Sequence, residues 1–215
     1  MKNIFILLVF VGFLFSCSSQ NGIDYNKLQT GDLIFVEAKQ KDLSGAINRV
    51  TQKSEVENFD HVGIIEITSD GIFVLHASTK LGSNKQSLKD FYKENLKKHQ
   101  NMVVYRLKKD YQKSIRPAII KANSMLGKPY NWSYILNEES YYCSDFIERI
   151  FREDGVFEHI PMNFINPKTH RIDDFRVQFY RKLEMDDPQD QSRKNPNQSA
   201  SSKELIRIGN LIAIQ

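Results

Sequence analysis

One cysteine and two histidines have the side-chain chemistry of a nucleophile and its bases. Nucleophilic cysteine catalysis needs a thiol that can ionise, a base that removes its proton and a third group that orients the base. The sequence offers Cys143, His61 and His76. Cys143 begins an amphipathic segment that is typical of a helix, and the unpaired N–H groups and positive dipole at a helix N-terminus lower the pKa of a thiol. A free thiol at this position is expected to be reactive.

The two histidines lie on a predicted β-hairpin. Apolar runs from His61 to Ile67 and from Ile72 to Ala77 flank Thr68-Ser69-Asp70-Gly71, and Asp-Gly between β-branched runs is a strong hairpin signal. A turn centred on this tetrapeptide makes His61 and His76 diagonal neighbours on one face, within reach of each other. A bulge or a register shift would change that distance. Taken alone, a strand histidine or a cysteine before a helix is more often structural, and only their combination points to catalysis.

The N-terminus has the pattern of an export signal. The apolar run Ile4–Phe15 is well short of the roughly 20 residues that span a bilayer core, and residues 1–16 are therefore expected to be a signal peptide. Leu14-Phe15-Ser16-Cys17 resembles the bacterial lipobox, in which the cysteine is acylated and becomes the new N-terminus. Cys17 is then a lipid anchor, and residues 17–27 form a tether. The alternative is an ordinary secretory signal with Cys17 incidental.

A lipid anchor at Cys17 implies a place in the bacterial cell envelope, on a membrane without crossing it. Ser18, and not an aspartate, follows the cysteine, which favours the outer membrane where a cell has two membranes. Cleavage removes one lysine and lowers the formal net charge from +4 to +3. This charge is too small, and the lysines are too scattered, to predict a nucleic-acid partner. With Cys17 lipidated, Cys143 has no disulfide partner within the chain.

The rest of the chain predicts one mixed α+β domain with an antiparallel sheet, over residues 28–215. Helices follow from apolar spacing and end signals, and strands follow from alternation and flanking turns. The segment 186–202, rich in Asp, Asn, Gln, Ser and Pro, predicts a mobile loop. The predicted strands are Leu33–Val36, Met102–Leu107, Phe175–Leu183 and, as a strand or a hairpin, Leu205–Ile214, and the predicted helices are Leu43–Gln52, Leu88–Lys98, Pro117–Gly127 and Ser144–Asp154.

Four short segments resemble the signature blocks of the NlpC/P60 superfamily of papain-like cysteine peptidases. The blocks are Gly31-Asp32-Leu33-Ile34-Phe35, His61-Val62-Gly63-Ile64, Leu75-His76-Ala77-Ser78 and Tyr142-Cys143-Ser144-Asp145-Phe146. The cysteine block comes last here, as in the circularly permuted branch of YiiX/YebB-like hydrolases and, more distantly, lecithin:retinol acyltransferase-type proteins. Residues 127–131 also resemble the segment before the cysteine in that branch. The resemblance implies a permuted papain-like fold, with the nucleophile at the N-terminus of a late helix.

The same resemblance implies the catalytic roles. Cys143 becomes the nucleophile, His61 the general base and His76 the polar residue that orients the base. Many relatives in the permuted branch carry a glutamate near the third position, and Glu66 is the available alternative. Glu66 lies five residues beyond His61, which puts it on the opposite face of a regular strand and counts against it.

Tyr130, Tyr142 and Asp32 are candidate residues of the substrate cleft. The two tyrosines would line the cleft or donate a hydrogen bond near the reacting carbonyl, with simple packing as the alternative. The expected role of Asp32 is structural, because an aspartate at this place fixes the turn into the first strand. The backbone N–H of Cys143 and a second, unassigned donor would hold the oxyanion.

The expected function is metal-independent hydrolysis of an amide bond through a thioester acyl-enzyme, without a cofactor. The resemblance implies a peptide stem of peptidoglycan as the substrate. A lipid or acyl-amine amidase, a thioesterase or an acyltransferase would use the same triad, and a non-catalytic ligand-binding lipoprotein is the non-enzymatic alternative. Zinc held by His61, His76 and Cys143 is a further alternative, but their spacing matches no compact zinc motif.

Overall fold

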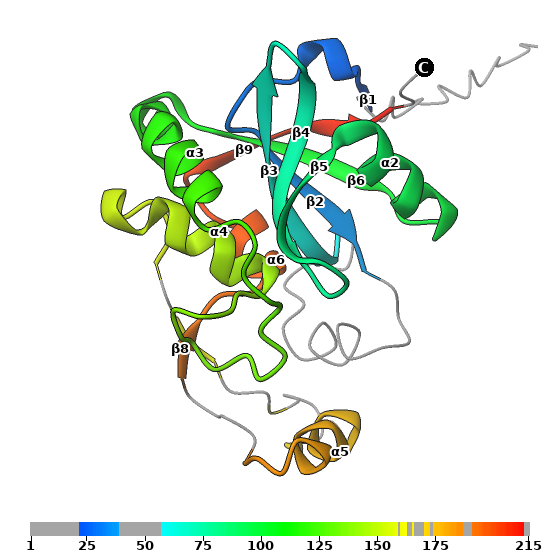
Figure 1. The fold of residues 1–215 in the computed structure, drawn as a ribbon, viewed down its shortest axis with the longest axis vertical. Helices are drawn as coiled ribbons and strands as arrows, with labels where there is room; N and C mark the ends of the chain where they lie inside the picture. The colour runs from blue at the N-terminus through cyan, green and yellow to red at the C-terminus, as the bar shows by residue number, and fades with distance from the viewer. Residues whose placement is uncertain are drawn as a thin grey trace, which may run out of the picture.

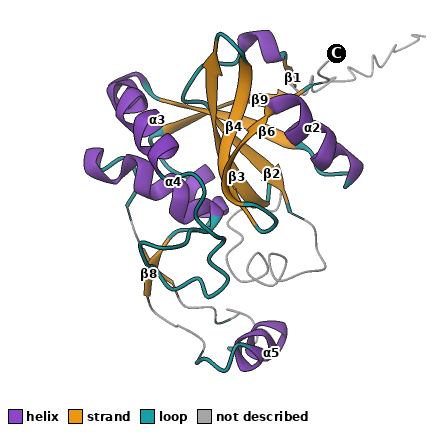
Figure 2. Cartoon of the chain, in the orientation of Figure 1, coloured by secondary structure: helices purple, strands orange, loops and turns teal. Residues whose placement is uncertain are grey.

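The computed structural model describes residues 22–38, 57–158, 160–162, 165, 170–172, 174–186 and 191–212. The predicted signal peptide, Cys17 and the predicted helix Leu43–Gln52 lie outside the described residues. The described strands and helices form an α+β domain, as predicted, in which helices cover both faces of one large sheet (Figure 1, Figure 2).

The central sheet has seven strands. They are β1 (Gly22–Ile23), β2 (Leu33–Glu37), β3 (Phe59–Thr68), β4 (Gly71–Ser78), β5 (Gly82–Ser87), β6 (Met102–Leu107) and β9 (Leu205–Leu211). Their spatial order is β1-β9-β6-β2-β3-β4-β5. Neighbours in this sheet are antiparallel except β1 and β9, which are parallel. Two short strands, β7 (Ile160–Met162) and β8 (Gln191–Arg193), pair in a separate sheet.

Two apolar cores hold the helices against the sheet. One core lies beneath α3 (Ile115–Ser124) and α4 (Cys143–Phe151), and the other lies beneath α2 (Leu88–Lys97). Successive side chains of a strand point to opposite faces, so β2 contributes Leu33 and Phe35 to the first core and Ile34 and Val36 to the second. The remaining helical elements are α5 (Asp174–Lys182), α6 (Pro196–Ala200), η1 (Tyr25–Lys27), η2 (Lys109–Ser114) and η3 (Arg152–Asp154).

The predicted hairpin is confirmed together with its register. β3 and β4 pair Ile67 with Ile72 and Ile64 with Leu75, which is the pairing that a turn centred between residues 69 and 70 produces. The predicted start of one helix is also confirmed. The side chain of Ser87 accepts a hydrogen bond of 3.1 Å from the backbone N–H of Asp90 at the start of α2.

Residues 22–27 belong to the domain and not to a free tether, which corrects one predicted boundary. β1 pairs with β9, and Ile23 is buried in the core beneath α2. The Asp24 side chain accepts from the backbone N–H of Asn26 and starts η1. A sheet edge that accepts one more short strand is a tertiary feature, and the polar composition of this segment did not reveal it.

One prediction for the C-terminal third is wrong, and one that left two alternatives open is confirmed in the first of them. The segment 175–183, predicted as a strand, forms α5. The charges at its two ends complement the helix dipole, with Asp174 in the first turn and Arg181 and Lys182 in the last. This helix signal is stronger than the imperfect alternation of apolar and polar residues on which the strand prediction depended. The last segment, predicted as a strand or a hairpin, is the single strand β9.

The predicted mobile loop 186–202 contains β8 and the short helix α6. Asn195 caps α6 in a capping box with Gln198. Asn197 is buried, accepts from the backbone N–H of Phe59 at 2.7 Å and donates to the side chain of Asn58 at 2.8 Å. The side chain of Asn197 thus satisfies the buried backbone N–H of Phe59 at the start of β3, so a low apolar content did not exclude secondary structure here.

Candidate active site

His61 on β3 and His76 on β4 contact each other directly. Nε2 of His61 and Nδ1 of His76 are 2.7 Å apart, and the ring centroids are 5.0 Å apart. Phe91 of α2 packs against both rings, so the pair lies on the face of the sheet that α2 covers. The predicted diagonal contact between the two histidines is therefore confirmed.

Both imidazoles are neutral at pH 7. Burial, followed by the charges of His76 and Lys98, lowers the pKa of His61 well below its usual 6.5. Burial lowers the pKa of His76 to about 4, against polar contacts that raise it. A neutral imidazole can accept a proton and an imidazolium cannot, so the pair is in the form that a general base requires.

Cys143 is the first residue of α4, directly after the N-cap residue Tyr142. Its thiol lies 3.9 Å from the carbonyl oxygen of Asp60 and also interacts with the backbone of Val62. Burial raises the pKa of the Cys143 thiol to about 12, although the helix start and the backbone of Val62 act in the opposite direction. The expected lowering of the thiol pKa by the helix N-terminus is thus reversed by burial.

The structure places the thiol beside the strand that carries the base, but it does not join them. Asp60 and Val62, whose backbones contact the thiol, are the residues on either side of His61. Cys143 belongs to the core beneath α3 and α4, whereas the imidazoles lie against α2. Within the described residues there is no hydrogen bond between the thiol and either imidazole. The resting chain therefore holds a neutral thiol and a neutral base that are not in contact.

Three tyrosines surround the nucleophile. The hydroxyls of Tyr130 and Tyr134 are 3.4 Å apart, and the ring of Tyr134 lies 5.1 Å from that of Tyr142. Burial raises the pKa of Tyr130 and Tyr134 above the usual 10.0, and the charge that a Cys143 thiolate would carry acts in the same direction. Both remain protonated donors at neutral pH. Tyr134 has φ 55°, in the left-handed region.

Asp32 is a structural residue, which corrects its inclusion among the candidate cleft residues. Its carboxylate accepts two hydrogen bonds from Arg106, at 2.6 and 2.8 Å, and one from the backbone N–H of Gln29 at 2.8 Å. Its carbonyl oxygen accepts from the N–H of Ile65, four residues along β3 from His61. Four residues of a strand span about 13 Å, too far for contact with the histidine pair.

Glu66 lies away from the histidine pair. Its carboxylate pairs with Lys85 at 2.8 Å and accepts from the side chain of Asn123, in α3, at 3.0 Å. It therefore lies on the α3 and α4 face of the sheet, as its odd spacing from His61 predicts. Among the described residues, no group of three or more His, Cys, Asp or Glu side chains gathers as candidate metal ligands.

β5, which the sequence did not predict, holds the segment that leads to Tyr130. The N–H of Ser83 donates to the carbonyl of Lys128, and the N–H of Gly127 donates to the carbonyl of Ser83, both at 2.8 Å. Gly82 allows this close approach, because a Cβ atom there would lie 2.1 Å from the Lys128 oxygen. The edge strand thus positions the aromatic part of the site.

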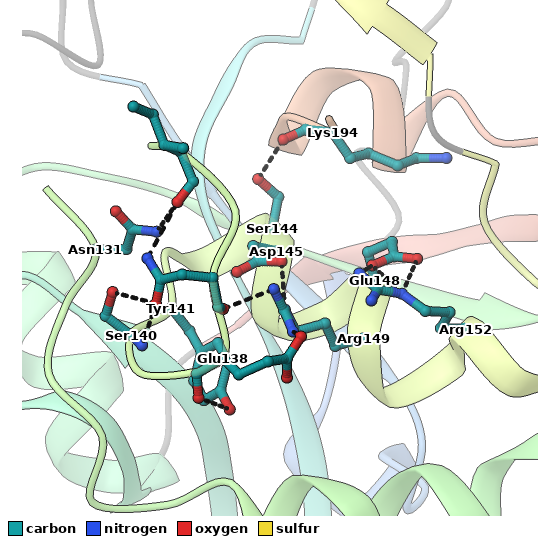
Figure 3. Close-up of polar contacts among 12 residues, drawn as sticks. Asn131, Glu138, Ser140, Tyr141, Ser144, Asp145, Glu148, Arg149, Arg152 and Lys194 are labelled. Carbon is teal, nitrogen blue, oxygen red and sulfur yellow. Dashed lines mark hydrogen bonds and ion pairs between the residues drawn. The ribbon is translucent and has the colours of Figure 1, made fainter. Parts of the chain in front are cut away.

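A buried arginine joins α4 to the loop before the nucleophile (Figure 3). Arg149 donates to Asp145 at 2.7 Å, to Glu138 at 2.5 Å and to the carbonyl of Asn137 at 2.8 Å. In the first turn, Ser144 donates to the carbonyl of Lys194 at 2.8 Å. Arg149 and Asp145, on the polar side of α4, are therefore buried in these contacts.

Replacing Arg149 by methionine is expected to destabilise the fold by about 3–5 kcal/mol, because it leaves the carboxylate of Asp145 buried without its cation. The side chains of Arg149 and Asp145 are 6% and 0% exposed. Arg207→Met is the matched control, since the pair of Arg207 with Glu57 is more exposed, at 39% and 23%, and is expected to contribute about 1 kcal/mol or less. Urea unfolding measures both variants, and equal losses would contradict the burial argument.

Comparisons with known proteins support a single family. The chain matches, over residues 27–211, the model of a family described as permuted papain-like amidase enzymes, YaeF/YiiX, C92 family. It also resembles the solved structure of the metalloprotein YiiX from Escherichia coli O157:H7, with a TM-score of 0.66 and 19% sequence identity, over 84% of this chain and 96% of that chain. No curated protein sequence matches the chain significantly.

The structural match to YiiX and the family match support different conclusions. At 19% identity the likeness to YiiX shows the fold, and it confirms the predicted permuted papain-like arrangement. The family match covers most of the chain and shows the coarse activity, a papain-like cysteine hydrolase of amide bonds. The chain therefore belongs to the permuted papain-like amidases of the YaeF/YiiX family.

Proposed function

We propose that this amidase works through a thioester acyl-enzyme, with Cys143 as the nucleophile, His61 as the general base and His76 as the residue that orients the base. The observation that supports this best is the hydrogen bond of 2.7 Å between the two imidazoles, on the strand whose backbone contacts the thiol. An imidazole held by a second polar group is what a cysteine nucleophile requires.

Acylation requires a rearrangement that brings the thiol, held near the carbonyl of Asp60, to Nδ1 of His61, because the resting structure keeps the two on different faces of β3. The thiol proton moves to Nδ1 while the sulfur attacks the carbonyl carbon of the substrate. Because the thiol pKa is about 12 and the imidazole is neutral, attack and proton transfer occur together and no thiolate–imidazolium pair waits beforehand. Catalytic contacts that are long in the free enzyme often tighten only when substrate binds.

The acylation step ends when the C–N bond breaks and His61 returns the proton to the leaving amine. Water then attacks the thioester, gives a proton to His61, and releases the acid as the proton returns to the sulfur. The backbone N–H of Cys143 stabilises the oxyanion in both steps. Tyr130 and Tyr134, which remain protonated, are available as further donors.

The proposed substrate is a peptide stem of peptidoglycan, which an exported protein would meet in the cell envelope. One observation favours a second candidate, an acyl amide with a long apolar chain. The ring of Trp132 packs 5.1 Å from that of Tyr130 and is 48% exposed, so aromatic surface continues from the nucleophile to solvent. Such a surface would also hold an acyl chain.

Mass spectrometry of the products separates the two substrates. The chain is incubated with stem peptides released from peptidoglycan and, separately, with long-chain N-acyl amides, and the free amine is measured. Cleavage of the stem peptide alone supports the first proposal. Cleavage of the N-acyl amide alone moves the assignment to a lipid amidase, and cleavage of neither substrate counts against both.

We also propose that Cys17 anchors the protein in the envelope, on the outer membrane where there are two. None of the helices in the described residues has the length and apolar character to cross a membrane. Expressed in a bacterium with a labelled fatty acid, the wild-type chain is expected to carry the label. Cys17→Ala is expected to lose it, while Cys143→Ala keeps it. Label retained in Cys17→Ala would contradict the anchor.

YiiX is described as a metalloprotein, whereas the mechanism proposed for this chain assigns no step to a metal. In this chain a hydrogen bond already joins Nε2 of His61 to Nδ1 of His76. A metal ion shared by them would have to break that contact. The proposed mechanism therefore uses side chains alone.

A further inference from the structure

Proton positions in the histidine pair follow from the proposed function, on which this inference rests. Each neutral imidazole carries one N–H. For Nδ1 of His61 to accept the thiol proton, the proton of that ring must be on Nε2. Nε2 of His61 then donates to Nδ1 of His76 over 2.7 Å. The proton of His76 is therefore on its own Nε2, and that N–H needs an acceptor.

Nε2 of His76 is enclosed by protein. His76 is 4% exposed, and its Nε2 atom has no hydrogen bond of good geometry with another described residue. Two side-chain amides of β5 lie on the same face of the sheet. Asn84 is directly opposite His76, and Gln86 is two residues further along the strand. Diagonal neighbours on one face are within reach of long side chains.

The two amides differ in their other contacts. Nδ2 of Asn84 donates to Oγ of Ser78 at 3.1 Å and to the carbonyl of Gly82 at 2.8 Å, so its orientation is already fixed. The side chain of Gln86 has no hydrogen bond to any described residue other than His76. Burial lowers the pKa of His76. Among the contacts that raise this pKa, the one with Gln86 has the largest effect.

We propose that the carboxamide oxygen of Gln86 accepts a hydrogen bond from Nε2–H of His76 and thereby sets the proton positions of both imidazoles. Gln86 is a positioning residue that touches neither the sulfur nor the substrate. Without this acceptor the opposite arrangement is favoured, in which Nδ1–H of His76 donates to Nε2 of His61. His61 then carries its proton on Nδ1 and cannot accept one from Cys143.

Three variants of β5 test this role by turnover. Gln86→Leu removes the acceptor and is expected to lower kcat by about tenfold to one hundredfold with KM unchanged. Gln86→Glu keeps an acceptor and is expected to restore kcat. Lys85→Leu is the matched control, because Lys85 lies on the other face of β5 and pairs with Glu66. An equal loss in Lys85→Leu and Gln86→Leu, or a loss in KM alone, overturns the proposal.

The pH profile adds a readout that a purely structural role would not move. A carboxylate at position 86 favours the imidazolium, so the acid limb of kcat/KM is expected to move to higher pH in Gln86→Glu and to lower pH in Gln86→Leu. Glu94 and Lys98, the charged groups of the α2 segment that act on the pair, are the same in every variant. If the acid limb of kcat/KM moves in the same direction in Gln86→Glu and in Gln86→Leu, the proposal is wrong.

Nitrogen-15 NMR of histidine-labelled full chain in detergent reads the ring protons without any substrate. The wild type is expected to show protonated Nε2 and bare Nδ1 on His61 and His76, and Gln86→Leu is expected to move the protons to Nδ1. Bare Nε2 on His76 in the wild type, or unchanged proton positions in Gln86→Leu, overturns the proposal. The expected proton positions in a wild type that hydrolyses no amide would support the Gln86 contact and refute the proposed function.

Discussion

Replacing Cys143 by alanine is expected to abolish amide hydrolysis, with kcat/KM falling by a factor on the order of 10⁴ or more. Cys143 is the only free cysteine in the described part of the chain, so nothing there can replace it as a sulfur nucleophile. A p-nitrophenyl ester provides a second test, because its acyl group stays on the enzyme long enough for mass spectrometry. The wild type is expected to gain one acyl group on the peptide that contains residue 143, and Cys143→Ala none.

Ser144→Ala controls for damage to the helix start. Ser144 is buried, and its hydroxyl donates to the carbonyl of Lys194, although its side chain also interacts with the Cys143 thiol. Loss of the bond to Lys194 is expected to cost about 1 kcal/mol of stability and to leave far more turnover than Cys143→Ala does, because the sulfur is still present. Full turnover in Cys143→Ala would place the nucleophile elsewhere. A wild type that is neither acylated nor active would favour the ligand-binding lipoprotein.

The parts of the site that the sequence predicted depend on local signals. The Asp-Gly turn defines the register of β3 and β4, and the register alone brings His61 and His76 together. The amphipathic run after Tyr142 defines α4 and puts Cys143 at its first residue. Such signals are contained within about ten residues, and tertiary structure did not override them.

The parts that the sequence did not predict depend on tertiary contacts. β5 has a polar sequence, and it is a strand because β4 and the Lys128 segment provide partners for its backbone. Arg149 and Asp145 lie on the polar side of an amphipathic helix, yet they are buried because the loop at Glu138 folds over them. No periodicity in one chain reveals what will cover a helix face.

The thiol pKa shows the same limit in energetic terms. The sequence places Cys143 at a helix N-terminus, which lowers a thiol pKa, but it does not reveal how deeply the sulfur is buried. Desolvation is the largest cause in the structure and moves the pKa to about 12. The helix end and the backbone contact with Val62 therefore lower the thiol pKa by less than burial raises it. As a result, the free enzyme has little thiolate at neutral pH.

Replacing His61 by alanine is expected to lower kcat for amide hydrolysis by about 10²–10⁴, the usual contribution of a general base. Alkylation of the thiol by iodoacetamide is expected to respond differently. Because the pKa of Cys143 is raised and His61 is neutral, the wild-type rate is expected to be low at pH 7 and to rise about tenfold per pH unit through pH 10, without a plateau at low pH. His61→Ala is expected to follow nearly the same curve.

The matched control is His99→Asn, an exposed position with φ 56°, which asparagine tolerates. It is expected to leave both measurements unchanged. The pH dependence of wild-type hydrolysis checks the base itself. Since folding lowers the pKa of His61 well below 6.5 and that of His76 to about 4, the acid limb of kcat/KM is expected below pH 6.5. An alkylation plateau below pH 7 that disappears in His61→Ala would instead reveal a preformed thiolate–imidazolium pair, and attack coupled to proton transfer would be wrong.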